Sequence, residues 1–311
     1  MLQMHIKVLK GGQSMKLTAI KISTVFICFI GLTSFLAFAK PPQPGQAQAT
    51  VPLPKDVPMY NLAKAKLFSG KQIFSFTQDT FDPAGYCEKA KHYDYTWFEM
   101  QHSVLEFRDI QAMLAACPHV HATPMIRLPD AQEMRIQHAT DIGVLGVIVP
   151  TVDDVDRARE AVKWSRYPPF ARRSTGAGLA VTLWGDNTFG VPPREFYART
   201  ANDNILVVIM IETPTGVANA YDIASVPGVD AVIIGNNDMS VFSGFAQTDD
   251  RYHALIQKVH DDVLRAGKIF GQANNKYATG PFSKDSYMFQ GGPSYDGWKP
   301  SEANGVPKNE Q

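Results

Sequence analysis

The 311 residues of the chain fit one large domain or two ordinary ones, because barrels of about 250 residues often form a single unit. Hydrophobic residues make up 45% of the chain and charged residues 19%, which excludes wholesale disorder. Thirty basic residues balance thirty acidic ones, so no net charge attracts a polyanion and we expect no nucleic-acid partner.

Residues 1–39 have the pattern of a secretory signal peptide. Lys16 and Lys21 precede an uncharged apolar run that ends in the triplet Ala-Phe-Ala at residues 37–39. A charged start, a short apolar run and a small-residue cleavage site are typical of a cleaved export signal. The alternative is an uncleaved anchor helix, since residues 22–39 are just long enough to span a bilayer. We predict an exported protein, periplasmic or secreted, without stable membrane contact after cleavage.

The remaining chain divides by composition into three parts. Residues 40–60 are rich in Pro and Gln and predict an extended linker. Residues 61–300 have the composition of one folded domain, and residues 301–311 form a polar tail. Met15 is an alternative start of the chain.

Within the folded part, short apolar runs alternate with amphipathic runs at helical spacing, which is typical of βα units around a parallel sheet. Strands are predicted at residues 73–77, 95–100, 123–127, 146–150, 205–212, 231–235, 269–272 and 287–290. Helices are predicted at residues 131–141, 155–164, 215–224 and 252–266, among others. Eight strands predict a single closed (β/α)8 TIM barrel of the α/β class.

Four polar residues stand at the ends of predicted strands, where a barrel places its active site. They are His102, Arg127, Glu212 and Asp238. Adjacent parallel strands lie about 4.8 Å apart, so the two carboxylates can share one divalent cation. The alternatives are a helix cap or a solvated loop position for each carboxylate, a rim ion pair for Arg127 and a core position for His102.

Other candidates for a metal site or a covalent link are weaker. His119 and His121 form an H-x-H pair that can bind zinc, but they precede the third strand and are expected at the opposite end of the barrel. The chain has three cysteines, too few for a disulfide-stapled scaffold. Cys87 and Cys117 fall in helices of separate βα units, and nothing in the sequence fixes their distance. The pairing stays open, with unpaired cysteines favoured.

The segments FEMQHS, TPMIRLP and VVIMIETPTGVANAYDIASVPGVDAVIIGNNDMS together resemble the HpcH/HpaI family of pyruvate-dependent class II aldolases and related lyases. The resemblance spans about residues 66–290. It is most specific in the stretch that ends with residues 166–169, Arg-Tyr-Pro-Pro, and in the strands that carry Glu212 and Asp238. It implies a (β/α)8 barrel and a homo-oligomer, commonly a hexamer with the final helix exchanged between neighbours.

The resemblance also implies roles for individual residues. Glu212 and Asp238 match the carboxylates that hold Mg²⁺, Mn²⁺ or Co²⁺, which chelates a small 2-oxo acid. Arg127 matches the arginine that binds the keto oxygen and stabilises the enolate, and His102 matches the acid-base residue. The implied activity is that of a metal-dependent carbon-carbon lyase.

Backbone amides near Gly235 and Asn236 match the loop that receives the substrate carboxylate in this family.

Departures from the family pattern leave other functions open. Neutral Gln101 replaces an acidic residue beside the histidine, and Met210 stands where a glutamine is common. Asn236 and Asn237 replace Pro-Ala before the second metal ligand. The alternatives are an exported 2-oxo acid binding protein without turnover, and a specialised biosynthetic condensing enzyme with a different acceptor pocket. The presence of His102 favours an enzyme, since a binding protein does not need it.

Overall fold

The structure is a computed structural model that describes residues 57–176, 178–184, 194–274, 282 and 284–299. The predicted signal peptide, most of the predicted linker and the polar tail lie outside these residues. None of the helices in the described part combines the length and the apolar character needed to cross a bilayer.

Eight parallel strands close into a barrel in the order β1 to β8, each hydrogen-bonded to the next, with β8 beside β1. The predicted fold class and strand order are thereby confirmed. The strands are β1 Ile73–Gln78, β2 Tyr95–Glu99, β3 Thr123–Arg127, β4 Gly146–Val149, β5 Leu206–Ile211, β6 Ala231–Ile234, β7 Ile269–Gln272 and β8 Met288–Phe289.

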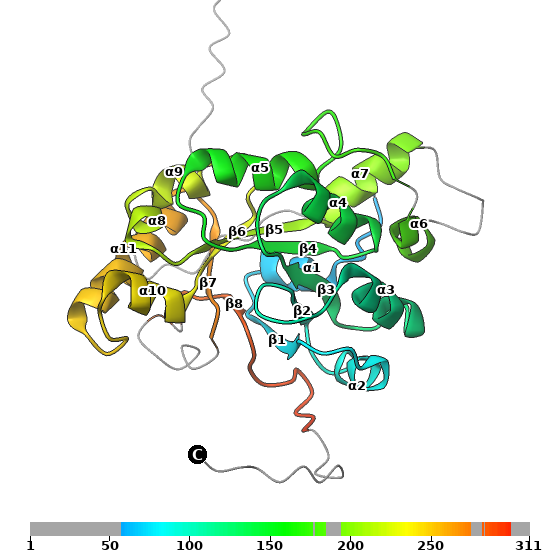
Figure 1. Cartoon of the computed structure of the whole chain (residues 1–311), viewed down its shortest axis with the longest axis horizontal. Helices are drawn as coiled ribbons and strands as arrows, with labels where there is room; N and C mark the ends of the chain where they lie inside the picture. The colour runs from blue at the N-terminus through cyan, green and yellow to red at the C-terminus, as the bar shows by residue number, and fades with distance from the viewer. Residues whose placement is uncertain (1–56, 177, 185–193, 275–281, 283, 300–311) are drawn as a thin grey trace, which may run out of the picture. The chain divides into compact units, whose positions relative to one another are not determined.

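Helices surround this barrel, and along most of the chain one or more helices connect each strand to the next (Figure 1). They are α1 Leu62–Phe68, α2 Pro83–Lys89, α3 Phe107–Ala116, α4 Glu133–Asp141, α5 Val155–Ser165, α6 Gly178–Trp184, α7 Arg194–Asn204, α8 Pro214–Ala218, α9 Ala220–Ala224, α10 Asn236–Ser243 and α11 Asp250–Arg265. The helix predicted over residues 215–224 is in fact two short helices. Asn219 separates them, and its side-chain amide donates to the Asp153 carbonyl at 2.7 Å.

Side-chain caps explain where several of these helices begin. The Asp82 carboxylate accepts from the Gly85 amide at 2.9 Å before α2, and Asp154 accepts from the Arg157 amide at 2.8 Å before α5. Each cap satisfies a backbone donor that the first helical turn leaves open. These caps therefore fix the first turns of α2 and α5 on the C-terminal side of β1 and β4.

The strands divide their side chains between two cores. In β5 every residue is buried, and alternate side chains point to opposite faces. Leu206, Val208 and Met210 fill the barrel interior, whereas Val207 and Ile209 pack against the surrounding helices. The same alternation decides which residues at the strand ends face the barrel axis.

Helix α1 closes the N-terminal end of the barrel. Asn204 Oδ1 accepts from the amides of Tyr60 and Asn61, at 2.6 and 2.9 Å. Lys64 Nζ donates to the Ile205 carbonyl at 2.7 Å and lies 3.8 Å from Asp230 Oδ1. Burial lowers the pKa of Lys64 to about 8, although the Asp230 carboxylate opposes this shift. The ordered contacts thus begin a few residues before Asn61.

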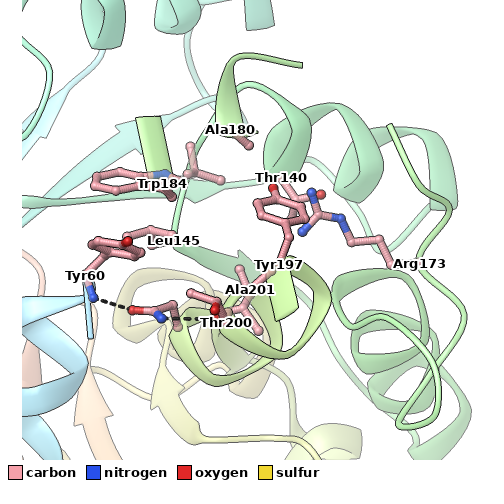
Figure 2. A pocket seen from close by; sticks show the side chains of 12 residues that line it. Tyr60, Thr140, Leu145, Arg173, Ala180, Trp184, Tyr197, Thr200 and Ala201 are labelled. Carbon is pink, nitrogen blue, oxygen red and sulfur yellow. Dashed lines mark hydrogen bonds between the residues drawn. The ribbon is translucent and has the colours of Figure 1, made fainter. Parts of the chain in front are cut away.

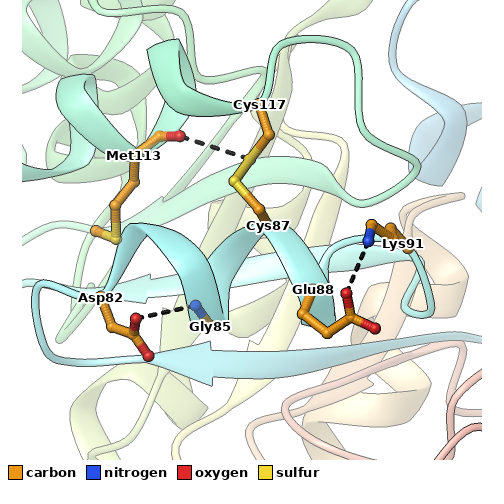
Figure 3. The surroundings of a disulfide bond; sticks show 7 residues. All are labelled: Asp82, Gly85, Cys87, Glu88, Lys91, Met113 and Cys117. Atoms are coloured by element: carbon orange, nitrogen blue, oxygen red, sulfur yellow. Dashed lines mark hydrogen bonds and ion pairs between the residues drawn. A yellow bond between two sulfur atoms is a disulfide. The ribbon is translucent and has the colours of Figure 1, made fainter.

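A disulfide links Cys87 in α2 to Cys117, the residue that follows α3 (Figure 3). The preference for unpaired cysteines was therefore wrong. Consecutive helices of a barrel pack side by side, and α2 and α3 bring the two Cα atoms to 5.8 Å, within the range of a disulfide. Spacing along the sequence does not reveal this proximity.

The chain after β8 folds back on the same subunit, and its described residues 290–299 contain no helix. The Tyr295 amide donates to the His92 carbonyl at 3.0 Å, and the Trp298 ring stacks on the His92 ring with centroids 4.6 Å apart. The His121 ring lies 4.4 Å from that of Tyr295, while His119 contacts Trp184. The H-x-H histidines thus take part in aromatic packing.

Candidate active site

Four inward-facing positions at the C-terminal end of the barrel carry Glu99 and three of the predicted residues, whereas His102 lies in the loop after β2 and Asp238 in α10. Glu99 follows Tyr95 and Trp97 on the interior face of β2, and Arg127 is its register partner on β3. Glu212 continues the interior row of β5, and Gly235 continues that of β6. Alternation along parallel strands therefore points these four positions to the barrel axis.

Arg127 is held by a carboxylate inside the barrel. Its Nη2 lies 2.5 Å and its Nε 2.6 Å from Glu99 Oε2, and the Trp97 Nε1 donates to the same oxygen at 3.0 Å. The side chains of Arg127 and Glu99 are 11% and 6% exposed. Burial works to raise the pKa of Glu99, but the Arg127 guanidinium outweighs it and holds that pKa below its usual value. Arg127 thus forms an ion pair, as one alternative proposed, but within the site.

The second oxygen of Glu99 fixes the turn that carries His102. Its Oε1 accepts from the amides of Gln101 at 2.8 Å and of His102 at 3.0 Å, and its carbonyl accepts from the Ser103 hydroxyl. The neutral side chain of Gln101 therefore does not leave the turn unsupported. The His102 side chain itself is exposed, next to the ion pair in the chain.

Glu212 is buried, with a side chain whose two oxygens have different surroundings. Its Oε1 accepts from both the amide and the hydroxyl of Thr151, each at 2.7 Å. Its Oε2 is buried and has no hydrogen-bond partner among the described residues. Burial raises the pKa of Glu212 to about 6; Asp238 adds to this shift, while Thr151 and Arg127 oppose it. Glu212 therefore senses both Asp238 and Arg127 electrostatically.

Gly235 makes room for this carboxylate. A Cβ at this position would lie 2.2 Å from Glu212 Oε2 and 3.0 Å from Met210 Sδ, so a side chain cannot be accommodated without displacing the glutamate. The Gly235 amide donates to the Ile211 carbonyl at 3.1 Å and is thereby committed to the sheet. Its contribution to the site is the space that it leaves.

Asn236 begins α10 and is almost fully buried. Its Oδ1 accepts from the Tyr252 hydroxyl at 2.7 Å, so its side chain anchors α10 to α11. The predicted contact with a substrate carboxylate stays a prediction for its backbone amide, at the N-terminus of a helix that also carries half-exposed Asp238 in its first turn.

The oxygen donors fit a hard divalent cation. Glu212 Oε2 is an unpaired acceptor on a buried carboxylate, and Asp238 is close enough to raise the pKa of Glu212. Within the described part of the chain, no group of three or more His, Cys, Asp and Glu side chains is arranged to hold a metal. Mg²⁺ and similar ions commonly bind one or two carboxylates and complete their shell with water and substrate oxygens. Two carboxylates therefore suffice here.

Two supporting residues were absent from the predicted site. Glu99 could have been found, because it ends an apolar strand on the same face as Tyr95 and Trp97. Thr151 could not have been found, because its role depends on a backbone φ of +50°. Sequence reasoning does not predict a positive φ for a β-branched residue.

A separate hollow lies near the opposite end of the barrel, beside α6 and α7 (Figure 2). Tyr60, Leu145, Arg173, Trp184 and Tyr197 are among its lining residues. Its enclosed volume of about 20 Å³ holds about one water molecule. It offers no room for a substrate, so the C-terminal end remains the candidate site.

Comparisons with known proteins agree with this geometry. The family model for HpcH/HpaI aldolase/citrate lyase matches residues 84–284, more than half of the chain. A 2-dehydro-3,6-dideoxy-6-sulfogluconate aldolase from Pseudomonas putida is 30% identical over 222 residues, which cover 71% of this chain and 82% of that protein. A 2-keto-3-deoxy-L-rhamnonate aldolase from Klebsiella pneumoniae is 32% identical over 190 residues, covering 61% and 68%. The crystal structure of an HpcH/HpaI aldolase from Desulfitobacterium hafniense superposes with a TM-score of 0.66 at 25% identity, over 74% of this chain and 90% of that one.

Proposed function

The chain belongs to the HpcH/HpaI aldolase/citrate lyase family of carbon-carbon lyases, and from this premise we propose that it is a class II aldolase that acts on a small 2-oxo acid at the C-terminal end of its barrel. One observation carries the proposal. Glu212 Oε2 is a buried carboxylate oxygen with no hydrogen-bond partner among the residues that the structure describes, at the barrel end that also holds the Arg127 guanidinium. An unpaired buried acceptor costs stability, so its retention indicates a ligand.

Glu212 and Asp238 would hold the divalent ion, Mg²⁺, Mn²⁺ or Co²⁺. When bound, the ion supplies Lewis-acid polarisation of the 2-oxo group. Arg127 has five N–H donors and uses Nε and Nη2 on Glu99, so its remaining donors can face the keto oxygen of the substrate. In the buried site the Arg127 guanidinium would stabilise the negative charge that develops on the keto oxygen.

His102 would move the proton. In the cleavage direction the hydroxyl proton at C4 of a 4-hydroxy-2-oxo acid goes to the imidazole and C4 becomes an aldehyde, while the electron pair of the C3–C4 bond forms the enolate of a pyruvate unit. The support for this role is the turn that Glu99 fixes beside the ion pair. Exposure of the imidazole lets it meet a substrate that enters from solvent.

The test uses the purified mature chain loaded with Mn²⁺. We expect pyruvate release from one or more members of a panel of 4-hydroxy-2-oxo acids and oxaloacetate, and no release by Glu212→Gln. Condensation of pyruvate with aldehydes, without cleavage of the panel, would favour the biosynthetic alternative. Pyruvate binding without turnover in either direction would favour the binding protein and contradict the aldolase proposal.

We also propose that the protein works outside the cytoplasm. The support is the signal-like pattern of residues 1–39 together with the bond between Cys87 and Cys117, since disulfides persist in oxidising compartments. Closure of a loop with a sequence separation of 30 stabilises a domain by about 3.6 kcal/mol. Thiol labelling of the exported chain should leave both cysteines unmodified, whereas deletion of residues 1–39 should expose them. Labelling of Cys87 and Cys117 in the chain expressed with residues 1–39 would contradict export.

A homo-oligomer is proposed as well. Large apolar side chains are exposed in the loops and the helix that follow β1, β2 and β6, and they include Phe81, Val104, Val241 and Phe242. Such side chains around the mouth of a barrel favour burial against another subunit. Light scattering after size exclusion should give a multiple of the chain mass, and a monomer at micromolar concentration would overturn this proposal.

A further inference from the structure

We propose that Thr151 is a positioning residue that restricts Glu212 to binding the divalent ion through Oε2 alone. The inference rests on the proposed metal-dependent function, and it concerns a residue that contacts neither substrate nor ion. Thr151 lies between β4 and α5, on the loop next to the end of β5.

The first argument is the hydrogen bonding of the Glu212 carboxylate. A carboxylate oxygen has about two lone-pair sites, and Oε1 receives two donors from Thr151, its amide and its hydroxyl, each at 2.7 Å. Oε1 is thereby occupied. Oε2 is buried with no partner among the described residues, so the only open acceptor of Glu212 is on the other side of the carboxylate.

The second argument is the backbone of Thr151 itself. Its φ is +50°, a left-handed conformation that is costly for a β-branched residue. Such strain persists only when the surroundings impose it. Here the Arg157 guanidinium donates to the Thr151 carbonyl at 2.8 Å, and the Val152 amide donates to the Met210 carbonyl at 3.1 Å. The strained turn is thus held to α5 through the Thr151 carbonyl and to β5 through the Val152 amide.

Further contacts join the same two loops. The Thr213 hydroxyl donates to the Asp153 carboxylate, and the Asn219 amide donates to the Asp153 carbonyl at 2.7 Å. The loop that carries Thr151 therefore cannot shift without the loop that carries Glu212. At the site, the strained conformation of Thr151 places its amide and its hydroxyl against the same oxygen, Oε1 of Glu212.

The third argument is the opposite wall. Gly235 leaves a space in which a Cβ would lie 2.2 Å from Glu212 Oε2. Thr151 binds Oε1 on one side of the carboxylate, and Oε2 occupies the space beside Gly235 on the other. Oε2 is therefore directed toward the end of β6. Asp238 lies in the first turn of the helix that follows β6. Thr151 thus aims the open oxygen of Glu212 toward the second carboxylate.

The experiment compares hydroxyl removal with hydroxyl retention in the full chain. Thr151→Val keeps the β-branched shape but loses one donor, and we expect its Mn²⁺ dissociation constant, measured by electron paramagnetic resonance titration, to rise about 10-fold. Thr151→Ser keeps the hydroxyl and should bind Mn²⁺ within about 2-fold of the parent. The matched control is Thr140→Val in α4, whose hydroxyl donates to the Ile136 and Gln137 carbonyls of its own helix. It should leave Mn²⁺ affinity unchanged.

Enzyme kinetics add a readout that a purely structural role would not give. Saturating Mn²⁺ should restore the kcat of Thr151→Val to near the parental value, with only the Mn²⁺ activation constant shifted. If the valine variant does not fold, Thr151→Ala removes the same hydroxyl without added bulk and gives the same test.

The outcomes are distinct. Equal Mn²⁺ affinity in the parent and in the hydroxyl-deficient variant would overturn the role of Thr151 and leave the proposed function standing. Failure of serine to restore affinity would also overturn it, since shape rather than the hydroxyl would then matter. A parent chain that binds no Mn²⁺ would contradict the proposed function itself.

Discussion

The two ends of the barrel both bury charged side chains, but they use them differently. At the N-terminal end the Lys64 ammonium donates to a backbone carbonyl, and Arg166 donates to two carbonyls and to Asp230. The Arg166 Nε has no partner among the described residues. Asp230 in turn accepts from the Val207 amide at 2.8 Å. These charges fasten loops and strand starts, which is how the stability end of a barrel is built.

The C-terminal end instead leaves a complete carboxylate oxygen open. Glu99 and Arg127 are paired there, yet Oε2 of Glu212 has no partner in the described part of the chain, and burial raises the pKa of Glu212. Buried charged side chains that donate to backbone carbonyls, such as Lys64 and Arg166, stabilise the fold. Buried charge with an open acceptor indicates a place where folding energy has been given up for a ligand.

The largest expected effect comes from Glu212→Gln, which should abolish tight Mn²⁺ binding and turnover while stabilising the metal-free protein. The folded-state pKa of Glu212 is raised from 4.5 to about 6, so the folded protein binds this proton more tightly than the unfolded chain. Stability is therefore lost as pH rises through this window, by about 2 kcal/mol. Thermal melts of metal-free parent and variant at pH 4.5 and at about pH 7 measure it.

The variant should gain on the parent between those two pH values. A constant difference in melting temperature would contradict the open-acceptor interpretation, and unchanged Mn²⁺ binding would remove Glu212 from the metal site.

The next effect in size is expected for Arg127→Lys. Lysine keeps the charge but loses the planar fork that donates to Glu99 through Nε and Nη2, so kcat should fall by about 10²-fold to 10³-fold with Mn²⁺ affinity retained. Arg173→Lys is a matched control, because the Arg173 side chain is more deeply buried than that of Arg127 but pairs with Asp141 away from the site. Parental kinetics in Arg127→Lys would make the Glu99 pair a structural one, like the pairs at the N-terminal end.

His102→Ala should lower turnover by about 10²-fold and spare Mn²⁺ binding. The histidine is exposed and its backbone amide donates to Glu99, so the substitution should also leave the melting temperature unchanged. His138→Ala in α4, whose ring packs on Phe107, provides a comparison outside the site. Loss of metal binding in His102→Ala would recast the histidine as a ligand.

Lys64→Met should have the smallest effect on catalysis, and none on Mn²⁺ binding. Its folded-state pKa is lowered from 10.5 to about 8, so between these values the unfolded chain binds the extra proton. The parent should therefore gain stability relative to Lys64→Met as pH rises from 8 to 10.5, by an amount on the order of 1–3 kcal/mol. Denaturant titrations at both pH values measure this. If the parent instead loses stability relative to Lys64→Met as pH rises from 8 to 10.5, the fold stabilises the Lys64 cation. That result would contradict a pKa lowered by burial.

The sequence was sufficient for the barrel because its strands are apolar runs that end at polar residues. The predicted bounds of the third strand, for example, agree with β3 Thr123–Arg127. The four candidate residues followed from the same rule, and register places Arg127 beside Glu99. Alternation alone indicates that a residue faces the barrel axis, but not which partner it meets there.

Features that depend on tertiary contact were beyond such reasoning. The ion pair of Glu99 requires the register of β2 and β3, and the role of Thr151 requires a backbone conformation that its side chain disfavours. The disulfide requires knowing that α2 and α3 approach at Cys87 and Cys117. Each is a property of how neighbouring units dock, which local patterning does not encode.

The distribution of the assigned residues around the barrel has a consequence for how this chain can change. Every one of them belongs to the units from β2 to β6, and the segments after β1, β7 and β8 supply none. Residues 79–82, which include the exposed Phe81, can therefore vary without disturbing the reactive groups. New acceptor preferences can be selected there by exchanging loop sequences, while the reactive groups on the neighbouring units from β2 to β6 are kept.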